Sequence, residues 1–338
     1  MYRELYPVEA ASKVSGRYIL RRVKKDSGLV VEERVINNVI TNGYFDQMLQ
    51  GRAFPKGFVV GAGTSTPLIT DTSLQSYIGG GASPQEYYTT INSTVFPRYI
   101  RRGFRVRSAE GATAGNISEV GIYFGGGFGD LGPAPERPLA SRARIVDELG
   151  NPTTITVASD EFLDLIFEWT YYAMDGLTGT MTINLLGTPT DFDYEVRPVC
   201  MNAPSCWARF TAGWPNNALS AIPYATNSNL GSCRVSSSST FEDPSSASNP
   251  AQSTDGNNWF SGLNSGPYTP GSRTRLFTLT LPLNSGNYAA PGIRSFLLGQ
   301  GDGSIGCSQM HRIVLDGPFL KLPTHVFTLP INISMSNA

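Results

Sequence analysis

The chain of 338 residues is long enough for one large domain or for two ordinary ones, each with its own core. Charged residues make up only 16% of the sequence, against about 25% in an average globular protein, while glycine (36) and proline (23) are plentiful. This mixture favours turn-rich β structure over helices. The net charge of −1 gives no overall field that would attract nucleic acid or an acidic membrane, so we expect neither as a partner.

Hydropathy gives no sign of a membrane segment. Nowhere do about 18 apolar residues follow one another, and the opening MYRELYPVEA lacks the basic lead and apolar run of a signal peptide. We therefore expect a chain that is made in the cytoplasm and does not insert into a membrane.

In chain order, residues 1–16 are expected to form an extended N-terminal arm. Apolar runs at 18–20 and 29–31 flank a glycine-containing connection and predict a β-hairpin. A short helix is predicted near residues 44–50, because four apolar side chains share one helical face there. These side chains are Tyr44, Phe45, Met48 and Leu49.

The segment up to residue 198 alternates with the period of β-strands. In residues 160–172 the odd-numbered side chains from Leu163 to Tyr171 are apolar, so one face of this strand is expected in the core and the other in water. Runs at 142–146 and 153–157 flank a Leu-Gly-Asn-Pro sequence and predict a second hairpin.

The character of the chain changes after residue 198. Residues 226–272 are rich in serine, asparagine, glycine and proline and predict long loops, whereas alternation returns at 276–281 and 327–335. We predict an all-β protein of two tandem, jelly-roll-like β-sandwich domains with one short helix. The expected units are the arm 1–16, a first domain 17–198, and a second domain 199–338 with long polar loops.

Two segments share the pattern G-N-x-x-x-x-G-I, one starting at Gly115 and the other at Gly286. Each follows an arginine-containing strand, and the Arg-Ile-Val of residues 144–146 returns at 312–314. Recurrence at this spacing indicates a duplicated domain.

The stretch FVVGAGTSTPL at residues 58–68 raises the question of a dinucleotide site. A pyrophosphate loop needs a helix directly after its glycines, because the phosphates bind the free N–H groups at the helix N-terminus. Here Pro67 follows Gly63 within four residues, and no amphipathic stripe follows. We expect no nucleotide or other cofactor at this stretch.

Catalytic and metal-binding patterns are weak. The only histidines, His311 and His325, lie near strands and are more typical of structural positions than of a catalytic base. The four cysteines form no CxxC pair, which argues against structural zinc. The alternating Asp191, Asp193 and Glu195 suit either Ca²⁺ or an ordinary strand surface. We predict no catalytic residue, metal or cofactor.

Three further carboxylates, Asp160, Asp164 and Glu168, fall on one strand face. Successive members lie roughly 13 Å apart along a strand, too far for either glycosidase geometry. We interpret them as a solvated face.

Five arginines are interleaved with apolar residues between positions 98 and 107. This spacing suits either a phosphate backbone or ion pairs with a neighbouring subunit. Because the net charge is near zero, we favour subunit contacts. The predicted contact residues are Arg98, Arg101, Arg102 and Arg105.

Aromatic residues of the second half are scattered among polar loop residues. Such side chains can stack on a sugar ring while nearby polar groups bind its hydroxyls, or they can fill the core beneath the loops. The residues singled out for binding a glycan or a protein partner are Trp207, Trp214, Tyr224, Trp259 and Tyr268.

The first half, over roughly residues 36 to 172, resembles a group of tailed-bacteriophage virion proteins from tail tips, baseplates and tail fibres. The resemblance is carried by the order and spacing of several short motifs. They are ITNG at 40–43, VGAGT at 60–64, TDTSL at 70–74, ISEVGIYF at 117–124, LASR at 139–142, GNPTTITV at 150–157 and FLD at 162–164.

The resemblance implies a structural virion subunit of the tail, acting in assembly and host attachment, with Gly61 and Gly63 as β-turn glycines. It implies other virion proteins as partners and a homo-oligomer, a trimer or hexamer. It offers no catalytic residues. Alternatives are a carbohydrate-binding receptor-recognition module that contacts host surface glycan, or a neck, collar or head decoration protein.

Overall fold

The described chain is nearly all β-structure, which confirms the all-β prediction. Its one helix, α1 (Asn42–Gln50), lies where the sequence predicted a helix. The structure is a computed structural model that describes residues 7–50, 54–125, 133–135, 137–185, 187–199, 201, 233–241, 243–245, 259–260, 263–284, 286–287, 291–300 and 308–338. Within these ranges no helix has the length and apolar character needed to cross a membrane.

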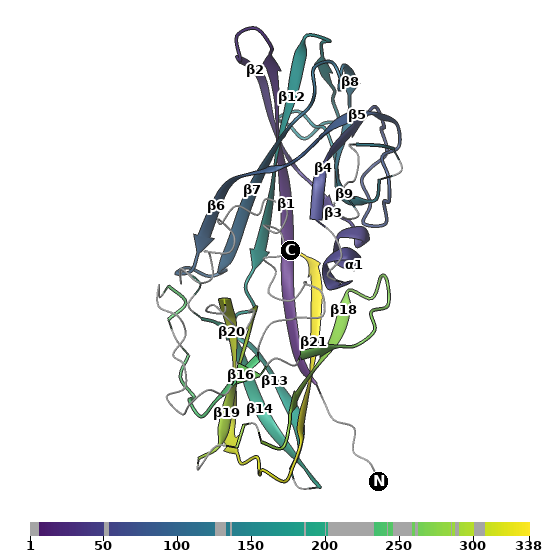
Figure 1. Ribbon diagram of the computed structural model, residues 1–338. Coiled ribbons are helices and arrows are strands. Elements are labelled where there is room, and N and C mark those ends of the chain that lie inside the picture. Colours follow the sequence, from purple (N-terminus) through teal and green to yellow (C-terminus); the bar gives the residue numbers. More distant parts are fainter. Residues whose placement is uncertain are drawn as a thin grey trace.

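The largest sheet runs along most of the elongated molecule (Figure 1). Its order is β17-β18-β21-β1-β12-β7-β6, with β2 paired to β1 beside this path. Its strands are β1 (Val8–Lys24), β2 (Val30–Asn37), β6 (Gln85–Asn92), β7 (Tyr99–Arg107), β12 (Glu161–Tyr172), β17 (Leu263–Ser265), β18 (Thr274–Leu281) and β21 (Phe327–Asn337). The predicted first hairpin is formed by β1 and β2, and Gly28 in its turn has a positive φ of 66°.

A second sheet packs over one half of the large sheet (Figure 1), in the order β3-β10-β9-β4-β5, with the pair β8–β11 nearby. These strands are β3 (Val39–Ile40), β4 (Phe54–Gly61), β5 (Tyr77–Ala82), β8 (Gly115–Ile117), β9 (Glu119–Gly125), β10 (Leu139–Arg144) and β11 (Ile155–Val157).

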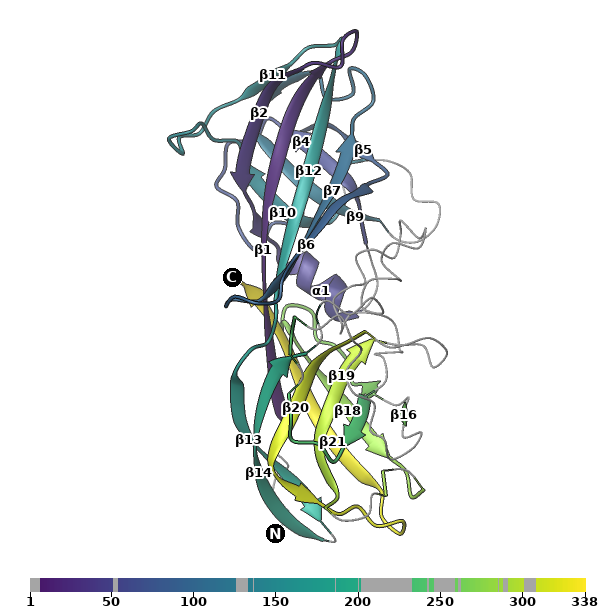
Figure 2. The ribbon, with the colours of Figure 1, turned by 90° about the vertical axis from the view of Figure 1, so that its left-hand side faces the viewer.

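A third sheet packs over the other half (Figure 2), in the order β13-β14-β20-β19-β15-β16. Its strands are β13 (Leu177–Leu185), β14 (Thr188–Pro198), β15 (Cys233–Ser236), β16 (Trp259–Phe260), β19 (Ile293–Gln300) and β20 (Ser308–Phe319).

The strand pairing of the first half recurs in the second. In residues 8–172, the first unit, β4 pairs with β5 and β9, β9 with β10, β10 with β3, and β7 with β6 and β12. In residues 177–338, the second unit, β15 pairs with β16 and β19, β19 with β20, β20 with β14, and β18 with β17 and β21. Corresponding strands follow the same chain order, so the two units share the topology that a duplication requires.

Strand β1 joins the two units. Its first half runs parallel to β21, with Val8 opposite Ile331, and its second half runs antiparallel to β12. Val8, Ala10 and Val14 are fully buried. Residues 8–16 are thus a central strand and not the expected arm, because their alternating apolar side chains complete the core.

The predicted domain boundary near residue 198 follows β14, whose Pro198 pairs with His311 of β20. Hydrogen-bonded pairing therefore places β13 and β14 with the strands of the second unit. The chain passes from one unit to the other at residues 173–176. A division into domains at residue 198 stays a prediction.

The second predicted hairpin forms only its turn. An isolated bridge joins Val146 to Pro152, but β10 then pairs with β9 while β11 pairs with β8. Ile155 and Val157 are buried in the core. Burial of these side chains, each worth about 1.5–3 kcal/mol, favours pairing with β8 over a continued hairpin.

One cluster of buried apolar side chains continues through both units. In the first unit the Tyr44 ring of α1 lies 5.1 Å from the Trp169 ring of β12. In the second unit the Phe319 and Phe327 rings lie 5.0 Å apart. The helix thus closes one end of the first unit, next to the junction (Figure 1).

Candidate functional site

Four of the sequence motifs meet at one buried ion pair. Glu119, from ISEVGIYF, is 1% exposed, and Arg142, from LASR, is 2% exposed. Arg142 Nη2 lies 2.7 Å from Glu119 Oε2, and Arg142 Nη1 donates to Asp71 Oδ2 at 2.7 Å. The Glu119 carboxylate also accepts backbone N–H groups from Gly63, Gln75 and Ser76. No single sequence motif predicts this network, because its members come from four separate segments.

The network explains the glycines of VGAGT. A Cβ atom on Gly61 or Gly63 would overlap Glu119 Oε1, so only glycine lets the backbone approach the carboxylate. Gly61 ends β4 and Gly63 follows it without forming a turn, so close approach is the requirement here and not the expected β-turn. The loop does hold an anion, but the anion is the protein's own Glu119.

The strands β1, β12 and β7 lie side by side (Figure 2), and their outer face carries carboxylates of β12 next to arginines of the neighbouring strands. Asp164 on β12 lies between Arg21 on β1 and Arg107 on β7, and Glu168 lies beside Arg17. Both Arg105 and Arg107 bind Asp164 through hydrogen bonds of 2.5 to 3.1 Å.

These two carboxylates of β12 are buried, with Asp164 3% and Glu168 1% exposed. Our interpretation of them as a solvated face is therefore wrong, because arginine side chains cover them. Burial tends to raise the pKa of Asp164, but hydrogen bonds from Arg107 and Arg105 outweigh it and hold this pKa below its ordinary value. What faces outward is mainly guanidinium.

The four arginines predicted as subunit contacts are not together. Arg101 and Arg105 lie on this outer face, where Arg101 Nε donates to Thr170 Oγ1 at 3.1 Å. Arg102 is 1% exposed, because the alternation of β7 turns it to the opposite side. Arg98 forms an ion pair with Asp175, next to the junction of the units. Subunit contact by these residues stays a prediction.

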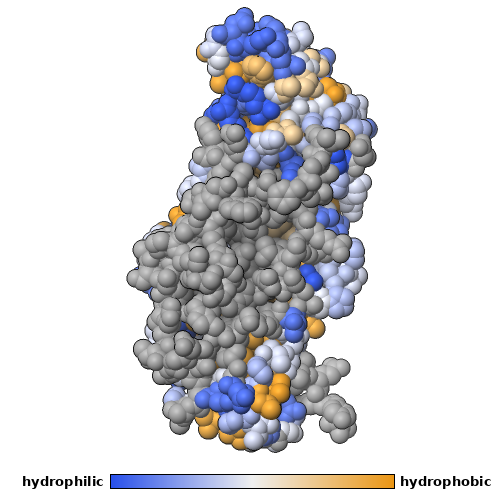
Figure 3. All heavy atoms as spheres, viewed as in Figure 1, coloured by the Kyte–Doolittle hydropathy of each residue, from blue (hydrophilic) through white to orange (hydrophobic). Residues whose placement is uncertain are grey.

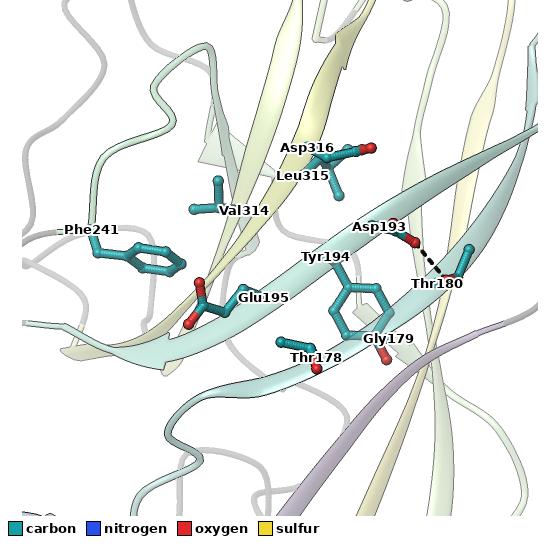
Figure 4. A pocket seen from close by; sticks show the side chains of 10 residues that line it. All are labelled: Thr178, Gly179, Thr180, Asp193, Tyr194, Glu195, Phe241, Val314, Leu315 and Asp316. Atoms are coloured by element: carbon teal, nitrogen blue, oxygen red, sulfur yellow. Dashed lines mark hydrogen bonds between the residues drawn. The ribbon is translucent and has the colours of Figure 1, made fainter.

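A cavity of about 500 Å³ opens on the outer face of β13, β14 and β20 (Figure 4). Its wall holds the carboxylates of Asp193, Glu195 and Asp316 and the ring of Phe241. Thr180 Oγ1 donates to Asp193 Oδ1 at 2.6 Å, as the dashed line in Figure 4 shows.

A second cavity of about 460 Å³ shares Glu195 and Phe241 with the first and adds the carboxylates of Asp175 and Asp243. We call the two cavities together the acidic groove. Alternation predicts Asp193 and Glu195 on one face, but no pattern in the sequence indicates that β20 or Phe241 lies beside them.

The aromatic residues predicted to bind a ligand receive little structural test. Trp207, Trp214 and Tyr224 lie outside the described residues, as does the side chain of Trp259, whose backbone forms β16. Prediction of a glycan site through these four rests on sequence alone.

Tyr268, in the loop between β17 and β18, connects this loop to the first unit. Its hydroxyl donates to Asp46 Oδ1 at 2.6 Å, and its ring packs against the core. Burial, together with the hydrogen bond to Asp46, raises the pKa of Tyr268 to about 12. These contacts give the side chain a structural role.

The histidines and acidic residues form no metal-binding group in the part of the chain that the structure describes. His311 is buried, and its Nε2 accepts the Met174 N–H at 3.1 Å. His325 Nδ1 lies 2.8 Å from the hydroxyl of the neighbouring Thr324. Hydrophobic residues, drawn in orange, are visible toward both ends of the molecule in Figure 3. Exposed aliphatic side chains include Leu29, between β1 and β2, and Val326, before β21.

Comparisons with protein-family models, with curated proteins and with solved structures return no match for this chain.

Proposed function

We propose that this chain is a structural subunit of a tailed-bacteriophage particle, in the tail tip, baseplate or tail fibre, where it acts in assembly and host attachment. The observation that carries the proposal is the convergence of four resemblance motifs on Glu119, Arg142 and Asp71. Short motifs far apart in sequence have no physical reason to occur together unless one fold requires them. Their convergence supports a resemblance of architecture.

Two further features support a role in assembly. The units share a topology and are joined by β1, which gives an elongated body suited to spanning and presenting surfaces (Figure 1). Charged side chains of the first unit form ion pairs with one another, as Asp164 does with Arg105 and Arg107. Such ion pairs fix the positions of the side chains, which suits a rigid structural part.

Immunogold labelling of particles produced by the genome that encodes this chain tests the proposal. We expect label on the tail. Label on the neck, collar or head would favour the alternative, a neck, collar or head decoration protein. Unlabelled particles would contradict the proposal.

Mass photometry of the purified chain provides a second test. We expect a closed assembly with three-fold or six-fold symmetry, because identical head-to-tail contacts between copies of one chain can close into a ring. A chain that stays monomeric at every concentration examined would count against an assembly role.

A further inference from the structure

We propose that the outer face of β1, β12 and β7 on one copy docks into the acidic groove of a second copy. This inference rests on the proposed function and names the contact through which copies assemble. We call the face the arginine platform.

The platform has a surplus of positive charge. The platform is the part of this face where β1 pairs with β12, from Lys13 onward, and it includes Glu33 of the neighbouring β2; the exposed Glu9 lies beyond it, where β1 pairs with β21. Its cationic side chains are Lys13, Arg17, Arg21, Arg101, Arg105 and Arg107, and its anionic ones are Glu33, Asp164 and Glu168. Six cations and three anions leave a net +3. The exposed fraction of the Arg17, Arg105 and Arg107 side chains is 39–43%, against 2–3% for Asp164 and Glu168. A partner therefore meets guanidinium groups.

The acidic groove has the opposite surplus. It is lined by the carboxylates of Asp175, Asp193, Glu195, Asp243 and Asp316 and by the guanidinium groups of Arg98 and Arg197. Five anions and two cations leave a net −3, equal in size to the surplus of the platform. Arg197 lies over the Phe241 ring and donates to Glu195, so this groove already binds one guanidinium group through an aromatic ring and a carboxylate.

Shape and placement agree with charge. The platform is an open sheet face from which long side chains project, whereas the groove is hollowed between β13, β14 and β20. The strands that carry the two surfaces, β1, β12 and β7 for the platform and β13, β14 and β20 for the groove, lie on the same side of the molecule, toward the viewer in Figure 2. Within one copy they face the same way and cannot meet, so the complement of each is supplied by another copy.

Charge reversal tests the contact. Arg101→Glu alters the platform without removing a ligand of Asp164 or Glu168, and Asp316→Lys alters the groove on the exposed side of β20. Each single variant is expected to weaken self-association at least about tenfold, measured by sedimentation velocity at about 50 mM NaCl. The double variant is expected to regain wild-type association, because the two reversed charges then face each other in every contact.

Lys25→Glu and Glu110→Lys provide matched controls, because this pair sits on exposed side chains near the tip of the β1–β2 hairpin, outside both surfaces. They change the net charge equally and should leave association unchanged. Wild-type assembly that neither reversal weakens, or a loss that the double variant does not restore, would overturn the inference alone. A wild-type chain that never associates would overturn the proposed function as well.

Discussion

The two units share one strand order but differ in how they bury charge. In the first unit the β9–β10 pair encloses Glu119 and Arg142, and β12 carries two carboxylates beneath arginines. In the second unit an ion pair joins Arg197 to Glu195, and both of these side chains are partly exposed.

Two buried polar groups of the second unit have neutral groups among their partners. Arg312 of β20 is 1% exposed and donates to Ser295 Oγ at 2.9 Å, while His311 accepts a backbone N–H. Stacked phenylalanines, among them Phe296 and Phe327, fill the space beneath. The comparison teaches that the two units reach one strand order although a carboxylate binds the buried Arg142 of β10 and a hydroxyl binds the buried Arg312 of β20.

The largest expected effect comes from Glu119→Gln, which keeps the shape of the side chain but removes its charge. Arg142 then loses one buried partner, and the free energy of unfolding should fall by about 3–5 kcal/mol in urea denaturation. Glu33→Gln is the matched control, since its pair with Arg21 is partly exposed and should be worth less than about 1 kcal/mol. Equal losses in the two variants would show that burial adds nothing to the pair.

Gly63→Ala should cost about 1–3 kcal/mol, because the new methyl group pushes Glu119 off its backbone donors. Thermal and urea denaturation measure the loss. Ala62→Ser, at the exposed neighbouring position, should change the stability by less than about 0.5 kcal/mol. If Gly63→Ala costs as much in a Glu119→Ala background, where no side chain is left for the methyl group to push, as in the wild type, the proposed cause is wrong.

His311 makes the second unit sensitive to acid. Burial lowers the pKa of His311 from 6.5 to about 3, so below about pH 6.5 the unfolded chain takes up a proton that the folded chain does not. Stability is therefore lost as the pH falls, by about 2 kcal/mol at pH 5 relative to pH 7. His311→Gln keeps an acceptor for the Met174 N–H but cannot titrate.

We expect this variant to lose about 2 kcal/mol less than the wild type between these two pH values in urea denaturation. An identical pH dependence in both proteins would show that folding does not lower the pKa of His311. A change in stability at pH 7 alone does not test the pKa of His311, because only the difference between the two pH values reports it.

Tyr268→Phe should have the smallest effect, a loss of about 1 kcal/mol, because it removes one hydrogen bond between the second unit and Asp46. Asp46→Asn, which retains an acceptor at the same place, should cost less. A loss of glycan affinity with no change in stability would instead return Tyr268 to the binding role that the sequence first indicated.

Much of the fold could be predicted from local patterns. The alternation in residues 160–172 matches β12, the apolar face at 44–50 matches α1, and the turn around Gly28 matches the first hairpin. The candidate surfaces could not be predicted in the same way. Asp164 lies on the face that alternation marks as wet, yet arginines from β7 bury it.

By itself, the sequence determined the class of fold, because strand period and turn propensity are properties of neighbouring residues. Only the tertiary structure decided that Val8 would lie beside Ile331, that Arg142 would bind Glu119, and that Phe241 would meet β20. Pairings of this kind depend on which distant segments share a sheet or a core. These pairings are selected by the free energy of the whole packed fold, which no local sequence pattern contains.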